Sequence, residues 1–248
     1  MNPTIIYGRD AELEQLRQFV FRRRSFLLHG PAGVGKTLLL KHLAGEVPEM
    51  VYCDESSSSQ TVFRSLAREL FVKKNHQVVK ACGTGGLNAL KDKSAVSIRG
   101  IVTEALHAGN HWIVLDHLQS PSQSFAAAVK DLCNRTESCL IAVARSAHME
   151  DAGFLLPMFS DRSEKFALRN FDSDTAREFA VQSAQQMQLS AANRDEAIDK
   201  IVYYSKGNPV AIVAMLQMAA SPKYVAQQQV KLSPLYIDFR LRWGATHG

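Results

Sequence analysis

Gly30-Pro-Ala-Gly-Val-Gly-Lys-Thr37 fits the pattern GxxxxGK[ST] of a phosphate-binding loop. An apolar run at residues 25–29 precedes the motif, and a helical pattern at residues 38–44 follows it. In such a strand–loop–helix, glycines let backbone N–H groups point at anionic oxygens, and the helix turns its positive end toward them. The motif therefore predicts binding of a nucleoside triphosphate.

Particular side chains have separate predicted roles. Lys36 places a point charge at the β- and γ-phosphates, and the Thr37 hydroxyl is a ligand for Mg²⁺. His111-Trp-Ile-Val-Leu-Asp116-His117 puts an aspartate at the end of a buried strand, where it holds the same ion through water. The residues predicted to contact the nucleotide from the loop and its helix are Gly30, Pro31, Ala32, Gly33, Val34, Gly35, Lys36, Thr37 and Leu38.

The residue after Asp116 bears on hydrolysis. Many ATPases carry a glutamate there to polarise the attacking water, and this chain has His117. Histidine can accept a proton near neutral pH, so His117 is a catalytic candidate, with a packing role as the alternative. We therefore expect hydrolysis to be slow.

Composition narrows the class of protein. The 248 residues are 46% hydrophobic and 21% charged, which is typical of a globular chain and not of a disordered or fibrous one. No apolar run approaches the ~20 residues of a membrane span, and the N-terminus lacks an apolar leader. The four cysteines form no CxxC pair. We expect a reduced cytoplasmic protein with no membrane association and no structural metal.

Positive charge is concentrated in one segment. The chain carries a net charge of +5, and residues 71–99 alone hold six basic residues against Asp92. A localised basic segment can attract nucleic acid or an acidic protein, and a solvated loop is the alternative. The six residues are Lys73, Lys74, Lys80, Lys91, Lys93 and Arg99.

Strand and helix patterns alternate over the first part of the chain. Short apolar runs at residues 51–53, 112–115 and 139–144 are typical of strands buried in parallel sheets, and helical spacing lies between them. Residues 73–97 are polar and glycine-rich, and we expect a long loop there. The alternation predicts an α/β fold: a P-loop NTPase core with a parallel β-sheet flanked by helices.

The pattern changes near residue 171. Residues 172–186, 191–204 and 209–220 each have helical spacing, and strand patterns stop. We therefore expect an α/β nucleotide-binding domain at residues 1–170 and a small helical lid domain at 171–222. Residues 223–248 form a C-terminal tail to which the sequence assigns no role.

With these residues in place, the chain resembles the AAA+/STAND branch of P-loop ATPases, particularly its archaeal-type and origin-recognition-like members. Besides the loop and the Asp116 strand, three stretches carry the likeness. Ile5-Ile-Tyr-Gly-Arg-Asp-Ala-Glu-Leu13 is similar to the FxGRxxEL box near the adenine. Leu140-Ile-Ala-Val-Ala-Arg145-Ser146 resembles a strand ending in a polar sensor. Lys206-Gly-Asn-Pro-Val-Ala-Ile212 is similar to the GxP box of the helical lid.

The resemblance implies further site residues. Those near the adenine would be Tyr7, Gly8, Arg9 and Pro209. Arg145 would be the sensor, and Arg162 is the candidate arginine finger, with Arg135 and Arg169 as rivals. Simpler interpretations exist for the same positions: a turn at Gly8-Arg9-Asp10, a surface arginine at 145, and a helix junction at Gly207-Asn208-Pro209.

The resemblance favours a nucleotide-dependent switch that binds ATP or ADP with Mg²⁺ between core and lid. Its slow hydrolysis would be completed by a neighbouring subunit of a homo-oligomer. The alternative is a non-hydrolysing ATP-binding scaffold, or a nucleic-acid adaptor that uses residues 71–99 and binds less tightly as salt rises. A small-molecule kinase is a third interpretation. A GTPase is disfavoured, because the sequence contains no NKxD motif.

Overall fold

The computed structural model describes residues 6–107, 109–161 and 164–247, with side chains as far as Trp243. Within these ranges, no helix combines the length and apolar character that crossing a membrane requires. The chain divides into two compact units, which are described separately. The sheet unit comprises Ala11–Gly30 and Lys36–Leu168, and the helical unit comprises residues 6–10, Pro31–Gly35 and residues 169–247.

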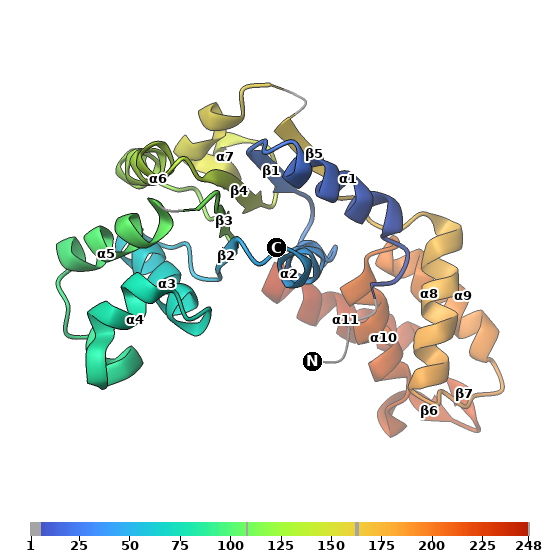
Figure 1. The fold of residues 1–248 in the computed structure, drawn as a ribbon. Coiled ribbons are helices and arrows are strands. Elements are labelled where there is room, and N and C mark those ends of the chain that lie inside the picture. The colour runs from blue at the N-terminus through green and yellow to red at the C-terminus, as the bar shows by residue number, and fades with distance from the viewer. Residues whose placement is uncertain (1–5, 108, 162–163, 248) are drawn as a thin grey trace. The chain divides into compact units, whose positions relative to one another are not determined.

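Five parallel strands form the sheet of the sheet unit, in the spatial order β2-β3-β4-β1-β5 (Figure 1). Parallel neighbours have to be joined by crossover connections, and helices supply these connections here. The predicted α/β class with a parallel sheet flanked by helices is confirmed. The strands are β1 (Phe26–His29), β2 (Met50–Cys53), β3 (Trp112–Leu115), β4 (Cys139–Ala144) and β5 (Lys165–Ala167).

Successive strand residues face opposite sides of the sheet. The ring of Phe26 lies 4.8 Å from that of Phe19 in α1, measured between centroids, whereas Leu27 belongs to the apolar cluster formed with α3, α5 and α6. The helices of this unit are α1 (Asp10–Phe21), α2 (Lys36–Glu46), α3 (Ser59–Val72), α4 (His76–Cys82), α5 (Ala95–His107), α6 (Gln123–Thr136) and α7 (Met149–Ala152), with 3-10 helices η1 (Gly83–Leu90) and η2 (Gly153–Phe159).

The expectation of a long loop at residues 73–97 is wrong. The chain forms α4 and η1 there before α5 begins. Asn75 caps α4, because its side-chain oxygen accepts hydrogen bonds from the N–H groups of residues 77 and 78. Val78 is fully buried, and Cys82 and Leu90 are nearly so. These three apolar side chains stabilise short helices that the surrounding polar residues concealed.

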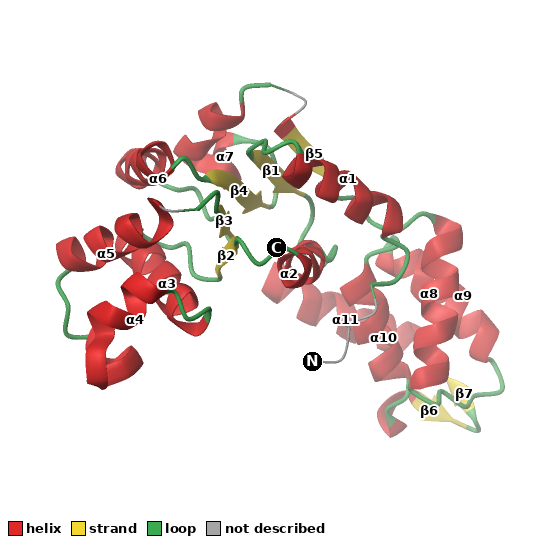
Figure 2. Cartoon of the chain, in the orientation of Figure 1, coloured by secondary structure: helices red, strands yellow, loops and turns green. Residues whose placement is uncertain are grey.

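Helices dominate the helical unit (Figure 2). The three predicted helices are confirmed as α8 (Ser173–Gln186), α9 (Arg194–Ser205) and α10 (Pro209–Ala219). The tail adds η4 (Pro222–Tyr224), a hairpin of β6 (Val225–Ala226) and β7 (Gln229–Val230), and α11 (Leu232–His247). Leu235 and Phe239, one helical turn apart, are buried in the same apolar core as α8, α9 and α10. The boundaries at residues 170 and 222 stay predictions.

A pair of glycine substitutions tests the packing of the sheet unit. Gly153 has φ of +50°, and a Cβ there would lie 2.4 Å from the carbonyl oxygen of Pro121. Gly153→Ala should therefore lower the free energy of unfolding by roughly 2–4 kcal/mol. Gly100→Ala, in the middle of α5 with no atom within 4 Å of the new methyl, should raise it by about 0.5–1 kcal/mol. Urea unfolding curves measure both, and similar midpoints for the two variants would contradict this packing.

Candidate functional site

The glycine-rich loop runs from the end of β1 to the start of α2. Gly33 has φ of +77° and Gly35 has φ of +102°, conformations that residues with a Cβ rarely adopt. The middle of the loop, Pro31–Gly35, clusters with the helical unit, whereas Gly30 and Lys36 cluster with the sheet unit. The loop therefore passes from one compact unit to the other and back.

Three consecutive carbonyls of the loop accept hydrogen bonds within the helical unit. The pairs are Asn208 Nδ2 to Ala32 O at 2.9 Å, Val210 N to Gly33 O at 3.4 Å and Arg9 Nη2 to Val34 O at 3.2 Å. In a planar trans peptide, a C=O group and the following N–H group point in opposite directions. The N–H groups of residues 33–35 therefore point away from these donors, as an anion-binding nest requires.

Arg9 is held on several sides. Its guanidinium also donates to the carbonyl of Arg169 at 2.7 Å and lies 4.3 Å from the ring centroid of Phe171. Its exposed fraction is only 6%. Tyr7 lies against the rings of Phe171 and Phe179, and its hydroxyl donates to Glu178 Oε2 at 3.0 Å. The predicted Tyr7-Gly8-Arg9 stretch is thus part of the helical unit, and Arg9 contacts the loop directly.

Asn208 both caps α10 and donates a hydrogen bond to the glycine-rich loop. Its side-chain oxygen caps α10 by accepting from Ala211 N at 3.1 Å, and Pro209 occupies the first helical position. Its side-chain nitrogen donates to Ala32 O in the loop and to Asn170 Oδ1. The helix-junction interpretation is confirmed, and the contact with the loop makes Asn208 an additional candidate residue.

Lys36 opens α2 beside the loop. Its Nζ donates to the carbonyl of Gly30 at 2.6 Å. Burial lowers the pKa of Lys36; the positive charge of Arg145 acts in the same direction, and Asp116 and Asp151 oppose it. The exposed Arg145, which follows β4, is therefore close enough to Lys36 to affect its charge. Two positive groups of this kind favour an anionic ligand.

Asp116 and Thr37 lie within hydrogen-bond distance of each other. The Thr37 hydroxyl donates to Asp116 Oδ2 at 2.7 Å, and Asp116 is only 1% exposed. The backbone N–H of His117 donates to the other carboxylate oxygen at 2.8 Å. Hydroxyl and carboxylate oxygens are ligands that Mg²⁺ prefers. The residues present therefore fit this ion.

Tyr52 of β2 also reaches this carboxylate, and sequence reasoning missed it. Its hydroxyl donates to Asp116 Oδ2. Strand register explains the contact, because Tyr52 pairs with Val114 of β3, two residues before Asp116. Burial raises the pKa of Tyr52, and the negative charge of Asp116 adds to the effect. No motif identifies such a residue; only the adjacency of β2 and β3 could have indicated it.

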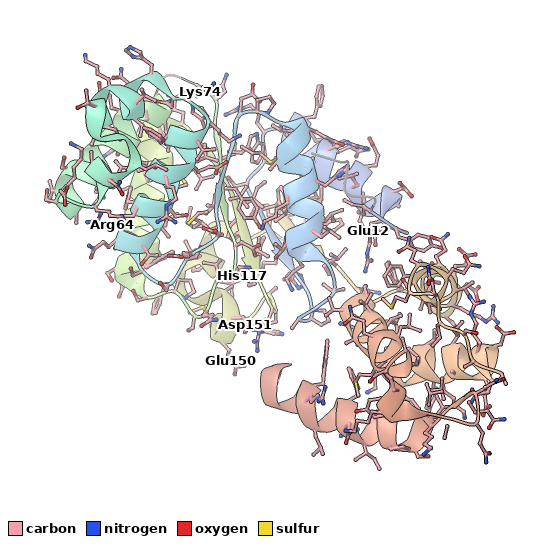
Figure 3. The ribbon with its side chains drawn as sticks, turned by 90° about the horizontal axis from the view of Figure 1, so that it is seen from below. Glu12, Arg64, Lys74, His117, Glu150 and Asp151 are labelled. Carbon is pink, nitrogen blue, oxygen red and sulfur yellow. The ribbon has the colours of Figure 1, made fainter. Side chains whose placement is uncertain are left out.

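His117 follows Asp116 and is labelled in Figure 3. Its φ is +58°, its side chain is 62% exposed, and its Nε2 lies 3.6 Å from Asp116 Oδ2. The imidazole is therefore open to solvent and still close to the carboxylate. The catalytic role of His117 stays a prediction.

The arginine-finger candidates differ in their surroundings. Arg162 lies outside the described residues. Arg135 is exposed at the end of α6, and its Nε pairs with Asp131 at 3.0 Å. Arg169 is exposed, and its carbonyl accepts the hydrogen bond from Arg9. Their roles stay predictions, as does nucleotide contact by Leu38, which is 45% exposed on the first turn of α2.

Comparison with known proteins identifies a related family. A family model described as "AAA ATPase domain" matches residues 5–144, which is more than half of the chain. The match includes the glycine-rich loop, the strand that ends at Asp116 and the whole of β4. No curated protein matches the sequence.

Three solved structures share the fold. The Walker-type ATPase of Pyrococcus abyssi is 17% identical, has a TM-score of 0.55, and is aligned over 85% of this chain and 67% of its own. Cdc6p from Pyrobaculum aerophilum is 13% identical, has a TM-score of 0.54, and is aligned over 89% of this chain and 63% of its own. The Aeropyrum pernix ORC1 protein in complex with DNA is 11% identical, has a TM-score of 0.59, and is aligned over 97% of this chain and 66% of its own. The chain thus spans about two thirds of each. At these identities the similarity concerns the fold.

His29 at the end of β1 shows how positive the surroundings of the loop's first residues are. Burial lowers the pKa of His29, and the charges of His148, Lys36 and Lys165 act in the same direction. The ordinary pKa of histidine is 6.5. Below that pH the unfolded chain therefore binds a proton at His29 more readily than the folded chain does, and the folded state loses stability.

Replacing His29 should reduce this sensitivity to acid. Between about pH 7.5 and about pH 5.5, the Tm of nucleotide-free wild type should fall further than that of His29→Gln. Differential scanning calorimetry at several pH values measures the difference. His76→Gln, at an exposed position that begins α4, is the matched control and should follow wild type. Identical pH profiles for His29→Gln and wild type would contradict the electrostatic account.

Proposed function

Because the chain belongs to the AAA ATPase domain family, we propose that it is a Mg·ATP-dependent molecular switch whose phosphate loop transmits the nucleotide state to the helical unit. The family match and the shared fold support a nucleotide-binding ATPase. In the proposal, Lys36 and the N–H groups of residues 33–35 bind the phosphates. Thr37 and Asp116 hold the Mg²⁺ ion, which neutralises charge on the phosphate oxygens.

The hydrogen bonds to the carbonyls of residues 32–34 carry the proposal. The peptides whose N–H groups would bind phosphate are the same peptides whose carbonyls pair with Asn208, Val210 and Arg9. A phosphate that reorients these peptides has to change those three hydrogen bonds. A ligand shifts a conformational equilibrium only through its different affinity for the two states. Phosphate would bind the loop with different affinity in the two arrangements of these hydrogen bonds, and would therefore shift the conformation of the helical unit.

Hydrolysis in this proposal is slow. His117 stands where a glutamate would polarise the attacking water, and its exposed imidazole is open to bulk solvent. Arg145, beside Lys36, supplies positive charge for the γ-phosphate. A neighbouring copy of the chain would complete the site with an arginine. Self-association would then couple nucleotide turnover to assembly.

Nucleotide binding is the first test. Lys36→Ala should weaken Mg·ATP binding by about tenfold or more, because a charge-assisted hydrogen bond is worth about 1.5–3 kcal/mol. Isothermal titration calorimetry measures the Kd, and Lys130→Ala on the exposed face of α6 is the control and should bind like wild type. Equal affinity in wild type and Lys36→Ala would contradict the assignment of the site.

The same proteins test the role of assembly. The rate of ATP hydrolysis per molecule should rise as protein concentration is raised, and Lys36→Ala supplies the background. A rate that never exceeds this background, in a protein that binds ATP, would favour the non-hydrolysing scaffold.

The fluorescence of Trp243 can measure whether nucleotide binding at the loop affects the helical unit. A Cβ at Gly33 would lie 3.4 Å from Cη2 of Trp243, so the indole of α11 reports on the loop. ATP should change the emission of Trp243 in a Trp112→Phe background, since Trp112 and Trp243 are the two tryptophans of the chain. Asn208→Ser keeps an oxygen to cap α10 and removes the donor to Ala32, and should reduce the change by about half or more.

Two control variants accompany the Trp243 fluorescence experiment. Asn75→Ser alters the cap of α4 in the sheet unit, and should leave the ATP-induced change at its wild-type size. Lys36→Ala should abolish the change at ATP concentrations that saturate wild type. A full-sized change in Asn208→Ser would show that the loop and the helical unit are not coupled through this residue.

A nucleic-acid adaptor is the second candidate, favoured by the basic residues 71–99 and by the fold shared with a protein solved in complex with DNA. Two of the six basic side chains have acidic partners, since Lys73 pairs with Glu69 and Arg99 with Asp131. These pairs reduce the charge available to phosphates. Arg64 of α3, labelled in Figure 3, donates to the carbonyls of residues 90 and 93 and so supports the segment from within. The switch is therefore the better-supported function.

A further inference from the structure

Tyr52 lies at the candidate metal site and has no role in the scheme above. Its hydroxyl and that of Thr37 both donate to Oδ2 of Asp116. A carboxylate oxygen has two lone pairs, so these two donors occupy both. The remaining oxygen, Oδ1, accepts the N–H of His117 at 2.8 Å. Oδ2 therefore has both of its lone pairs occupied by protein donors, and Oδ1 has one donor from the backbone.

The two hydroxyls at Oδ2 differ in what they could do with an ion present. The oxygen of Thr37 keeps lone pairs for Mg²⁺ while its own proton is donated in a hydrogen bond to Asp116. The hydroxyl of Tyr52, on strand β2, occupies the other lone pair of Oδ2, so a metal-bound water could donate to Oδ2 only by displacing it. Tyr52 and such a water are therefore mutually exclusive at this oxygen.

We propose that Tyr52 is a positioning residue that holds the Asp116 carboxylate in the nucleotide-free protein and competes with metal-bound water for Oδ2. The inference rests on the proposed function, because it assumes that Mg·ATP binds at this site. Asp116 is 1% exposed, and a buried charge without donors is costly. Tyr52 supplies one donor, and so raises the Mg²⁺ concentration at which nucleotide binds.

The packing of Tyr52 allows its hydroxyl to be removed alone. Its ring lies 5.7 Å from Lys41 Nζ, measured to the centroid, and phenylalanine retains the ring. The experiment is a Mg²⁺ titration of the binding of a fluorescent ATP analogue, followed by anisotropy at a fixed analogue concentration. Tyr203→Phe is the matched control, because Tyr203 is 75% exposed on α9.

Tyr52→Phe should lower the half-saturating Mg²⁺ concentration by about fivefold, since removing a competing state raises apparent affinity. Tyr203→Phe should match wild type. The Tm of the nucleotide-free protein should fall in Tyr52→Phe, because Asp116 loses a donor. Saturating Mg²⁺ and the analogue should then raise the Tm of Tyr52→Phe by more than they raise that of wild type.

Other results overturn the inference in distinguishable ways. A lower Tm with an unchanged Mg²⁺ requirement would show a purely structural role for Tyr52. A higher Mg²⁺ requirement in Tyr52→Phe would show that the hydroxyl assists the ion. Failure of wild type itself to bind the analogue at saturating Mg²⁺ would remove the proposed function, and this inference with it.

Discussion

The buried carboxylate of Asp116 links several elements of the sheet unit. At 1% exposure its charge has to be matched by hydrogen-bond donors, and they come from α2, from β2 and from the chain directly after β3. The first turn of α2, which carries Lys36 and Thr37, is therefore bonded to the carboxyl end of β3. The group that fits a metal ion also holds together the elements around it, so binding chemistry and local stability depend on the same atoms.

A second constraint comes from the loop itself. Glycines at 33 and 35 allow the backbone conformation, but they provide no side chain to hold it. Stabilisation comes from Asn208, Val210 and Arg9, which pair with the carbonyls of residues 32–34. Residues near both ends of the chain thus shape a loop near its beginning. The conformation of the loop therefore depends on hydrogen bonds from residues far from it along the chain.

Local patterns predicted much of the fold and failed where burial was sparse. The apolar runs at 112–115 and 139–144 coincide with β3 and β4, because strands of a parallel sheet are buried on both faces. The helices within residues 73–97 were not predicted, because α4 is short and inward-facing residues such as Val78 are widely spaced. The helix α11 in the tail was not predicted either, although Leu235 and Phe239 share one helical face. Pro234 lies in the first turn of α11, where a missing N–H costs little.

The candidate site divides in the same way. The glycine-rich loop with Lys36 and Thr37 could be recognised from its spacing, since the chemistry requires those residue types close together along the chain. Asp116 could be recognised because it directly follows an apolar run typical of a buried strand. Tyr52 donates to Asp116 across 64 positions, and Asn208 donates to Ala32 across 176. Contacts at such separations depend on which strands are neighbours and on how the later helices pack. Periodicity records only which face of an element is apolar, so these partners became visible only in the folded chain.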